Sequence, residues 1–363
     1  MRKTMPLILL ILLWSGTSIS SQNASLGEAP VYLQDLVQGQ QGPLAAMQSL
    51  PAEDFSVNPQ SREESRSFFN HHYLEDLQPG ADWTGDCSTC DAGTTGHDFR
   101  NFVLQRVNFF RAMAGVPANV SFNDTYSAKS QKAALMMSVN DQLSHSPPES
   151  WTCYSEQGAE AAGSSNLALG AFGREAVDLF MKDAGSGNGF AGHRRWILYP
   201  QTQTMGTGDI PHAGGRAANS LWVFDGNFGG QRPASREEFV AWPPPGYVPY
   251  QVVYPRWSLS YPHADFSHSS VTMRMAGESV DVVLEPLGTG YGENTLVWRP
   301  DGMGSFESWG KPASDITCRV TVSNVGVDGT NRSFSYDVVI FDPAVPAPEK
   351  NHSMPWLFLL LDD

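Results

Sequence analysis

The sequence predicts an α+β protein in which a mixed region of helices and strands precedes an all-β region. Apolar residues recur at three- and four-residue spacing from Phe99 to Ala114, which is typical of an amphipathic helix. Over residues 316–340, apolar and polar residues alternate instead, as in a hairpin with one buried face. A stiff, proline-rich connector over residues 241–250 lies between the two patterns. We therefore expect two folded parts of different class.

The N-terminus has the layout of a secretory signal peptide. Arg2 and Lys3 precede an apolar run from Leu7 to Trp14, and small residues follow. This run is shorter than the roughly 20 apolar residues of a membrane-spanning helix, and so is the apolar stretch near the C-terminus. We expect removal of residues 1–20, no transmembrane anchor, and a secreted, extracellular protein, or a periplasmic one in a Gram-negative bacterium.

Composition and charge exclude several classes of protein. The chain has 363 residues, of which 41% are hydrophobic, so it has enough apolar side chains for real cores. Its formal net charge is −15, and loss of Arg2 and Lys3 with the signal peptide lowers it by two, to −17. Such a charge repels phosphate backbones and anionic lipid surfaces, so nucleic acid is excluded as a partner.

Changes in composition divide the rest of the chain into four parts. Residues 21–96 are rich in Gln, Ser, Pro, Gly and Glu, which predicts a flexible or pro-segment arm, with one short helix within residues 61–77. The mixed α/β pattern covers residues 97–236. The β domain covers residues 237–345, and residues 346–363 form a C-terminal tail.

The mixed region contains predicted helices first and predicted strands later. Its elements are expected to be helices over 97–114, 124–140 and 173–185, followed by strands over 193–200, 202–209 and 219–226. Strand alternation would point one of Arg194 and Arg195 inward and the other outward. On the third helix Asp183 falls on the apolar stripe, where a carboxylate needs a partner.

The β region is expected to be an immunoglobulin-like or fibronectin-like sandwich. Its clearest signal is the hairpin, in which a turn at Asp328 and Gly329 separates two alternating runs. Further strand patterns cover residues 271–275, 279–286 and 294–300. In the hairpin pattern Cys318 points inward and has a structural role.

Cys87 and Cys90 form the only close pair among the four cysteines, and we predict a local disulfide between them. A thioredoxin-like redox motif would need a strand before the pair and a helix directly after it, and the sequence has neither. A zinc site would need two more convenient ligands, which Cys153 and Cys318 do not obviously supply.

Residues from about 97 to 225 resemble the CAP superfamily of cysteine-rich secretory proteins, antigen 5 and pathogenesis-related class 1 proteins, in its bacterial-type branch. The resemblance lies in ordered motifs: VNFFRAMAGVPANVSFN with Asn108 and Arg111, LSHSPP with His145, SSNLALG, FMKD, and GHRRWILYPQTQTMGTGD. It implies a CAP/SCP-like αβα sandwich with a central cleft where two histidines and two acidic residues meet. The predicted fold is therefore an αβα sandwich followed by an all-β immunoglobulin-like sandwich.

By this resemblance, His145 and His193 match the two cleft histidines, and Asp183 matches the second acidic residue. Ser165 stands where the family has its first acidic residue, so the chain departs from the pattern there. Either this chain keeps only three of the four cleft residues, or Glu160 or Glu156 from the preceding loop replaces the missing acidic residue.

Two imidazoles and one carboxylate suit Zn²⁺ or another divalent cation with an open coordination position. The resemblance therefore predicts a metal site at His145, Asp183 and His193. The alternative is that the two rings only form hydrogen bonds to Asp183 and to the backbone. Asn108 and Arg111 are assigned structural roles, because an inward-facing arginine usually joins loops through its planar fork of donors.

These observations predict a secreted CAP-like binding protein with an accessory β-sandwich and an unidentified small-molecule, lipid or protein ligand. Catalytic residues cannot be assigned, because Ser164 and Ser165 do not lie in the G-x-S-x-G pattern of a nucleophile. The first alternative is a secreted metal-dependent hydrolase that uses the same cleft. The second is an extracellular adhesion or surface-attachment protein that acts through the β domain.

Overall fold

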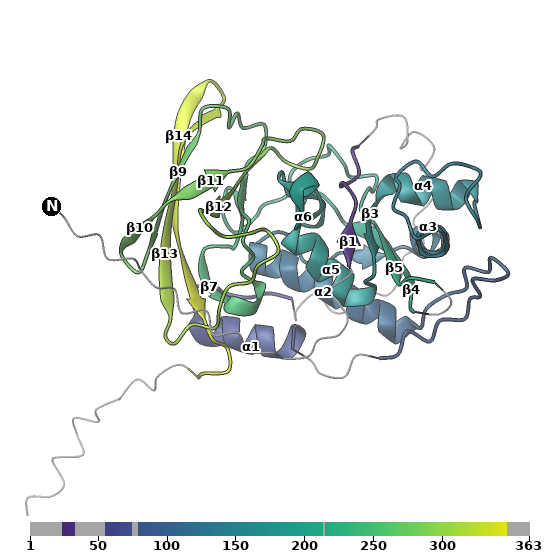
Figure 1. The fold of residues 1–363 in the computed structure, drawn as a ribbon. Coiled ribbons are helices and arrows are strands. Elements are labelled where there is room, and N and C mark those ends of the chain that lie inside the picture. Colours follow the sequence, from purple (N-terminus) through teal and green to yellow (C-terminus); the bar gives the residue numbers. More distant parts are fainter. Residues whose placement is uncertain (1–23, 33–54, 75–78, 213–214, 347–363) are drawn as a thin grey trace, which may run out of the picture.

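A computed structural model of the chain describes residues 24–32, 55–74, 79–212 and 215–346. The predicted signal peptide lies outside this part, and so does the predicted tail over residues 346–363 apart from its first residue. Within it, no helix combines the length and the hydropathy needed to cross a bilayer. Figure 1 shows a helix-rich part beside a part built from two β-sheets, in the order predicted.

The helix-rich part is built on a five-stranded sheet with the order β1-β3-β5-β4-β2. Its strands are β1 (Ser25–Leu26), β2 (Ser121–Phe122), β3 (Ser165–Leu169), β4 (Thr204–Ile210) and β5 (Ala218–Trp222). All neighbouring pairs are antiparallel except β2 and β4, which run parallel. Side chains alternate across the sheet, so that in β3 Leu167 and Leu169 face one hydrophobic cluster and Ala168 faces another.

Helices cover both faces of this sheet. The helices are α2 (His97–Ala114), α3 (Asp124–Asn140), α4 (Glu156–Ser164), α5 (Gly173–Lys182) and α6 (Gly192–Ile197), with the short 3₁₀ turn η4 (Ser186–Asn188) before α6. Residues of α3 and α4 pack with Leu167, whereas residues of α2, α5 and α6 pack with Ala168. This arrangement confirms the αβα sandwich.

Two glycines in β4 bring helix α3 against the sheet. A Cβ atom on Gly208 would lie 2.1 Å from the backbone nitrogen of Gln131, and one on Gly206 would lie 2.5 Å from the Cβ of Tyr126. Both distances are far inside van der Waals contact, so any larger residue would push α3 outward. The TMGTGD motif therefore has a packing role.

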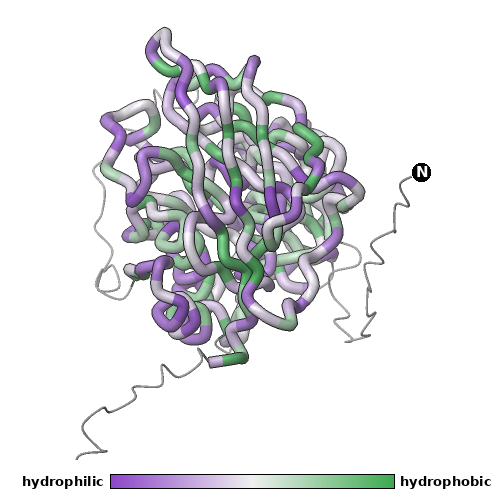
Figure 2. Tube along the Cα trace, turned by 90° about the vertical axis from the view of Figure 1, so that its left-hand side faces the viewer, coloured by the Kyte–Doolittle hydropathy of each residue, from purple (hydrophilic) through white to green (hydrophobic). Residues whose placement is uncertain are grey.

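The second part is a β-sandwich of two sheets, with the orders β10-β9-β13-β14-β7 and β11-β12-β8-β6. Its strands are β6 (Val240–Trp242), β7 (Gly246–Pro249), β8 (Trp257–Ser260), β9 (Ser270–Met275), β10 (Glu278–Val280), β11 (Val282–Leu284), β12 (Thr295–Pro300), β13 (Ile316–Val327) and β14 (Thr330–Phe341), with a 3₁₀ turn, η5 (Tyr250–Val252), after β7. The predicted hairpin is confirmed, since Cys318 pairs with Val338 and is buried. Figure 2 shows hydrophobic and hydrophilic residues alternating along the long strands.

The helix-rich part and the sandwich share one hydrophobic core. The ring of Phe110 in α2 packs edge-on against Trp242 in β6, with centroids 5.2 Å apart. Helix α1 (Arg62–His72) lies against β7, and the preceding Pro59 carbonyl accepts a hydrogen bond of 2.7 Å from the Tyr247 amide. The two parts thus meet across an apolar contact.

The predicted strand at residues 193–200 is wrong, because its first residues form helix α6. The Asp183 carboxylate accepts a hydrogen bond of 3.2 Å from the Arg194 amide, which satisfies a free donor of the first helical turn. Arg194 and Arg195 are both buried, contrary to the predicted alternation. Arg194 donates to the Arg256 carbonyl at 2.8 Å, and Arg195 to the Tyr291 carbonyl at 2.6 Å. The two arginines therefore join α6 to the sandwich.

Candidate histidine cleft

His193 in α6 and Asp183 at the end of α5 form a fully buried pair. Nδ1 of His193 lies 2.8 Å from Oδ1 of Asp183, and both side chains are 0% exposed. Asp183 caps α5 in the left-handed backbone region, with φ 54°, which directs its carboxylate toward α6. In the neutral ring with its proton on Nδ1, this nitrogen donates to the carboxylate and Nε2 carries the lone pair. Nε2 is buried and has no hydrogen-bond partner among the described residues.

His145 lies in the loop after α3, half-buried, with each ring nitrogen near a backbone carbonyl. Nδ1 is 2.6 Å from the Ala162 oxygen, and Nε2 is 2.6 Å from the Glu28 oxygen. Burial lowers the pKa of His145 from its usual value, and nearby His193 lowers it further, although the two carbonyls favour protonation. The neutral ring is thus favoured, and a neutral ring donates through only one of its nitrogens.

The three residues predicted to hold a metal are not assembled as three ligands. Among the described residues, no group of three or more His, Cys, Asp or Glu side chains is arranged to hold an ion. Both oxygens of Asp183 already accept hydrogen bonds, from His193 and from the Arg194 amide. The two histidines share one feature of metal ligands, since Nδ1 of each faces an oxygen acceptor, but Nε2 of His145 also faces the Glu28 carbonyl. The metal site stays a prediction.

Ser165 and Glu160, named as additional cleft residues, have different surroundings. Ser165 is fully buried, and its hydroxyl makes no hydrogen bond with any described residue, so it forms no Ser–His pair with either ring. Glu160 in α4 accepts a hydrogen bond of 2.6 Å from Nζ of Lys129. Asn166, next to Ser165, donates to the His193 carbonyl at 3.1 Å and so joins β3 to α6.

Asn108 and Arg111 hold the loops around helix α2. Asn108 exchanges two hydrogen bonds with the backbone of Val120, at 3.0 and 3.1 Å. Arg111 is fully buried and donates to backbone carbonyls of Pro117, Ile197, Tyr199 and Thr202 at 2.7–3.0 Å. Burial lowers the pKa of Arg111 to about 9. Arg111 thereby fixes the chain that leaves α6.

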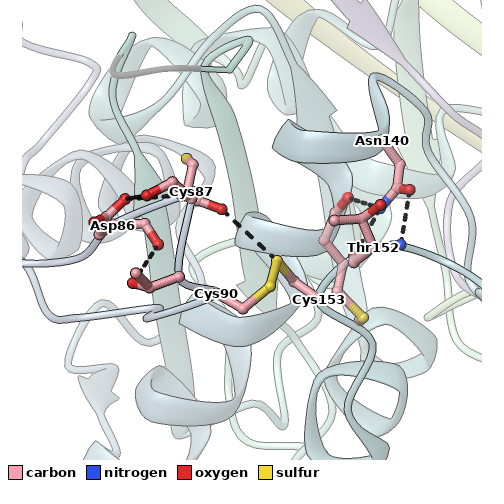
Figure 3. The surroundings of a disulfide bond; sticks show 9 residues. Asp86, Cys87, Cys90, Asn140, Thr152 and Cys153 are labelled. Carbon is pink, nitrogen blue, oxygen red and sulfur yellow. Dashed lines mark hydrogen bonds between the residues drawn. A yellow bond between two sulfur atoms is a disulfide. The ribbon is translucent and has the colours of Figure 1, made fainter.

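The predicted disulfide between Cys87 and Cys90 is wrong, because Cys90 is bonded to Cys153. The two bonded residues have Cα atoms 5.1 Å apart, and Cys87 is a free thiol. Oδ1 of Asp86 accepts hydrogen bonds from the amide and the hydroxyl of Ser88, which tightens the turn between the two cysteines. Figure 3 shows the Cys87 sulfur pointing away from the disulfide. The bond ties this turn to the loop that carries His145.

A pocket of about 950 Å³ lies beside the disulfide. Its lining includes Trp151, Tyr154, Lys132 and Glu149, and none of the three cleft residues. At the predicted histidine cleft, in contrast, residues 24–32 of the chain itself lie against His145 and Trp196. Sequence reasoning placed this segment in the arm over residues 21–96 and did not connect it with the cleft. A main-chain carbonyl such as that of Glu28 leaves no signature in a sequence.

The fold defines a three-layer αβα unit with a buried Asp–His pair, joined to a β-sandwich. Residues 104–225, about a third of the chain, match the family model CAP, the cysteine-rich secretory protein family, so this chain contains a CAP domain. The match confirms the family resemblance, whereas assignment to the bacterial branch stays a prediction.

Among solved structures, the chain is similar to PcoC, a methionine-rich copper resistance protein from Escherichia coli, at 16% identity. That match covers 28% of this chain and 92% of PcoC, with a TM-score of 0.21. The comparison with curated proteins finds no match.

Proposed function

We propose that this chain is a secreted CAP-type binding protein whose ligand site is the cleft around His145, Asp183 and His193. The observation that carries the proposal is the buried Nε2 of His193, which has no hydrogen-bond partner in the part of the chain that the structure describes. A buried polar atom left without a hydrogen bond costs about 1–3 kcal/mol. A ligand that presents a proton donor or a cation to this nitrogen would recover part of that cost. The signal-peptide pattern and the CAP domain support secretion.

The same geometry supports a divalent cation as one ligand of the cleft. In the tautomer of His145 with its proton on Nδ1, both histidines would bind the ion through Nε2, while the Ala162 carbonyl and Asp183 accept from the Nδ1–H groups. In this arrangement Asp183 orients His193 instead of binding the ion. A bound zinc ion would supply Lewis acidity. Because the Glu28 carbonyl faces Nε2 of His145, metal binding requires this carbonyl to move.

The hydrolase and adhesion alternatives have no specific observation in their favour. A metal-dependent hydrolase would need a carboxylate as general base, and both oxygens of Asp183 already accept hydrogen bonds, while Glu160 accepts one from Lys129. The sandwich is an accessory part in our proposal, and its contacts with α6 support a role in holding the cleft.

Zinc titration of the purified chain by calorimetry tests the metal-binding part of the proposal. We expect one site per chain in the wild type and its loss in a His145→Ala, His193→Ala double variant. His268→Ala is the matched control, because His268 is exposed on the sandwich. Equal zinc binding by the wild type and the double variant would overturn the assignment of the metal to this cleft.

A further inference from the structure

Residues 24–32, with the sequence ASLGEAPVY, cross the histidine cleft and contact both parts of the protein. Strand β1 adds to the edge of β3 in antiparallel register, with Ser25 opposite Leu169 and Leu26 opposite Ala168. Figure 1 shows β1 in purple beside β3. At the other end of the segment, the Tyr32 amide donates to the Gly290 carbonyl of the sandwich at 3.3 Å. The segment thus extends from the CAP sheet to a sandwich loop.

Side chains of the CAP part bind the backbone of this segment. Nε1 of the buried Trp196 donates to the Pro30 carbonyl at 2.8 Å. Nε2 of His145 lies 2.6 Å from the Glu28 carbonyl and donates to it in the tautomer with its proton on Nε2, the opposite tautomer to the one that would bind a metal. Both acceptors are main-chain atoms, which every peptide presents. Strand addition to a sheet edge, combined with pockets for a few side chains, is a common mode of peptide recognition.

The surface under the segment also selects side-chain size. Ala29 is 3% exposed, and a Cβ atom on Gly192 would lie 2.6 Å from its Cβ, so this position accepts a small residue. The ring of Tyr32 stacks on Phe228, with centroids 3.6 Å apart, which favours an aromatic residue there. Val31 lies between these positions and is 44% exposed, so its identity is less restricted.

We propose that this surface is a groove for extended peptides and that residues 24–32 occupy it as a tethered ligand. The peptide it accepts has a small residue at the position of Ala29 and an aromatic residue three positions later, at the position of Tyr32. This inference rests on the proposed function and deepens it, because it names the ligand class of the cleft that contains His145. A short tether gives an effective concentration of about 1 mM, so a free peptide competes well only after the tether is cut.

The test uses a full-length chain with a protease recognition sequence inserted after Gly39 and an affinity tag on its N-terminal fragment. After cleavage and removal of that fragment, fluorescein-labelled ASLGEAPVY is titrated and its anisotropy measured. We expect saturable one-to-one binding to the cut chain, and binding at least about tenfold weaker to the uncut chain. The inference is overturned if a cut chain with the circular dichroism spectrum of the uncut chain binds no peptide, or if both chains bind equally.

Substitutions that add a methyl group at position 192 and remove one at position 29 test the contact between Gly192 and Ala29. Gly192→Ala is expected to weaken binding of the peptide, and a peptide with Ala29→Gly is expected to restore it. Gly187→Ala is the control, because a Cβ atom there meets nothing within 4 Å. If Gly192→Ala weakens both peptides equally, the proposed contact between positions 192 and 29 is wrong.

Substitutions in the free peptide test the groove without any change to the folded protein. On the unmutated cut chain, Tyr32→Ala in the peptide is expected to weaken binding, whereas Val31→Thr leaves it within about twofold, because an exposed site contributes little. Equal binding of these two peptides would also contradict the proposed groove.

The zinc titration tests the metal-binding proposal independently of peptide binding. Peptide binding without zinc binding removes the metal proposal alone, and zinc binding without peptide binding removes this inference alone.

Discussion

Asp183 and His193 meet through a 2.8 Å contact between two side chains that are both 0% exposed. The carboxylate also accepts from the Arg194 amide, so one side chain orients the histidine and caps the helix that carries it. The cleft and helix α6 therefore depend on the same carboxylate.

Replacement of Asp183 by Asn is expected to destabilise the protein by about 1–3 kcal/mol, because the amide group cannot accept from both donors through two oxygens. The free energy of unfolding, measured in urea, provides the check. Asp98→Asn is the matched control, because the Asp98 side chain is 89% exposed, and a change within about 0.5 kcal/mol is expected. An Asp183→Asn protein as stable as the wild type would show that the pair contributes nothing.

Replacement of Arg111 by Lys is expected to cost about 3–5 kcal/mol, because one ammonium group cannot reach the carbonyls that the guanidinium joins. Denaturant unfolding again measures the loss. Arg319→Lys is the control, because the ion pair of Arg319 with Asp337 lies on the surface. This substitution is expected to change the free energy of unfolding by less than about 0.5 kcal/mol. Similar losses in the two variants would contradict the role assigned to Arg111.

Loss of the disulfide by Cys153→Ser is expected to reduce stability by about 2–4 kcal/mol. Cys87→Ser should leave stability nearly unchanged, because Cys87 is a free thiol. Peptide mapping without reduction should recover Cys90 joined to Cys153. A Cys87–Cys90 peptide in that map would contradict the structure.

Burial raises the pKa of Cys318 to about 12, so its thiol is expected to resist alkylation at pH 8.5 until the sandwich unfolds. In the unfolded chain the thiol ionises near its usual value, about 8.5. The folded state therefore keeps its proton longer, and this thiol makes stability fall as pH rises from about 9 toward 12. Iodoacetamide labelling with and without denaturant measures the protection. Equal labelling rates in the two states would contradict the buried position.

The helix-rich part and the sandwich are expected to unfold in one transition, because Phe110 and Trp242 belong to a shared core and α6 donates to sandwich carbonyls. Near-ultraviolet and far-ultraviolet circular dichroism should give coincident melting curves. Two separated transitions would show that each part is stable without the other.

Sequence periodicity predicted the elements whose side chains repeat over a long stretch. The β13–β14 hairpin belongs to this group because one face of β13 is buried. Helix α2 also belongs to it, since Phe99 and Val103 are buried four residues apart, although residues 106–114 are all buried. Helix α6 has only six residues, too few for the pattern to distinguish a helix from a strand. Its helical form depends on Asp183 and on carbonyls distant in sequence.

For the site, the resemblance located His193 and Asp183, and the apolar stripe indicated that the carboxylate needs a partner. The disulfide could not be predicted from local spacing, because Cys90 and Cys153 are 63 positions apart. The segment over the cleft was missed for a similar reason. Its contacts use the backbone of Glu28 and Pro30, and backbone atoms are the same in every sequence.

The guanidinium group of Arg195 donates hydrogen bonds to three main-chain oxygens of the sandwich, those of Gly288, Tyr291 and Glu293. Substitutions in that loop can therefore accumulate without loss of the attachment, provided that the course of the chain is kept. Insertions or deletions there are a different matter, because they displace all three oxygens together. Relatives with a similar sandwich should therefore differ in the amino-acid sequence of this loop far more than in its length.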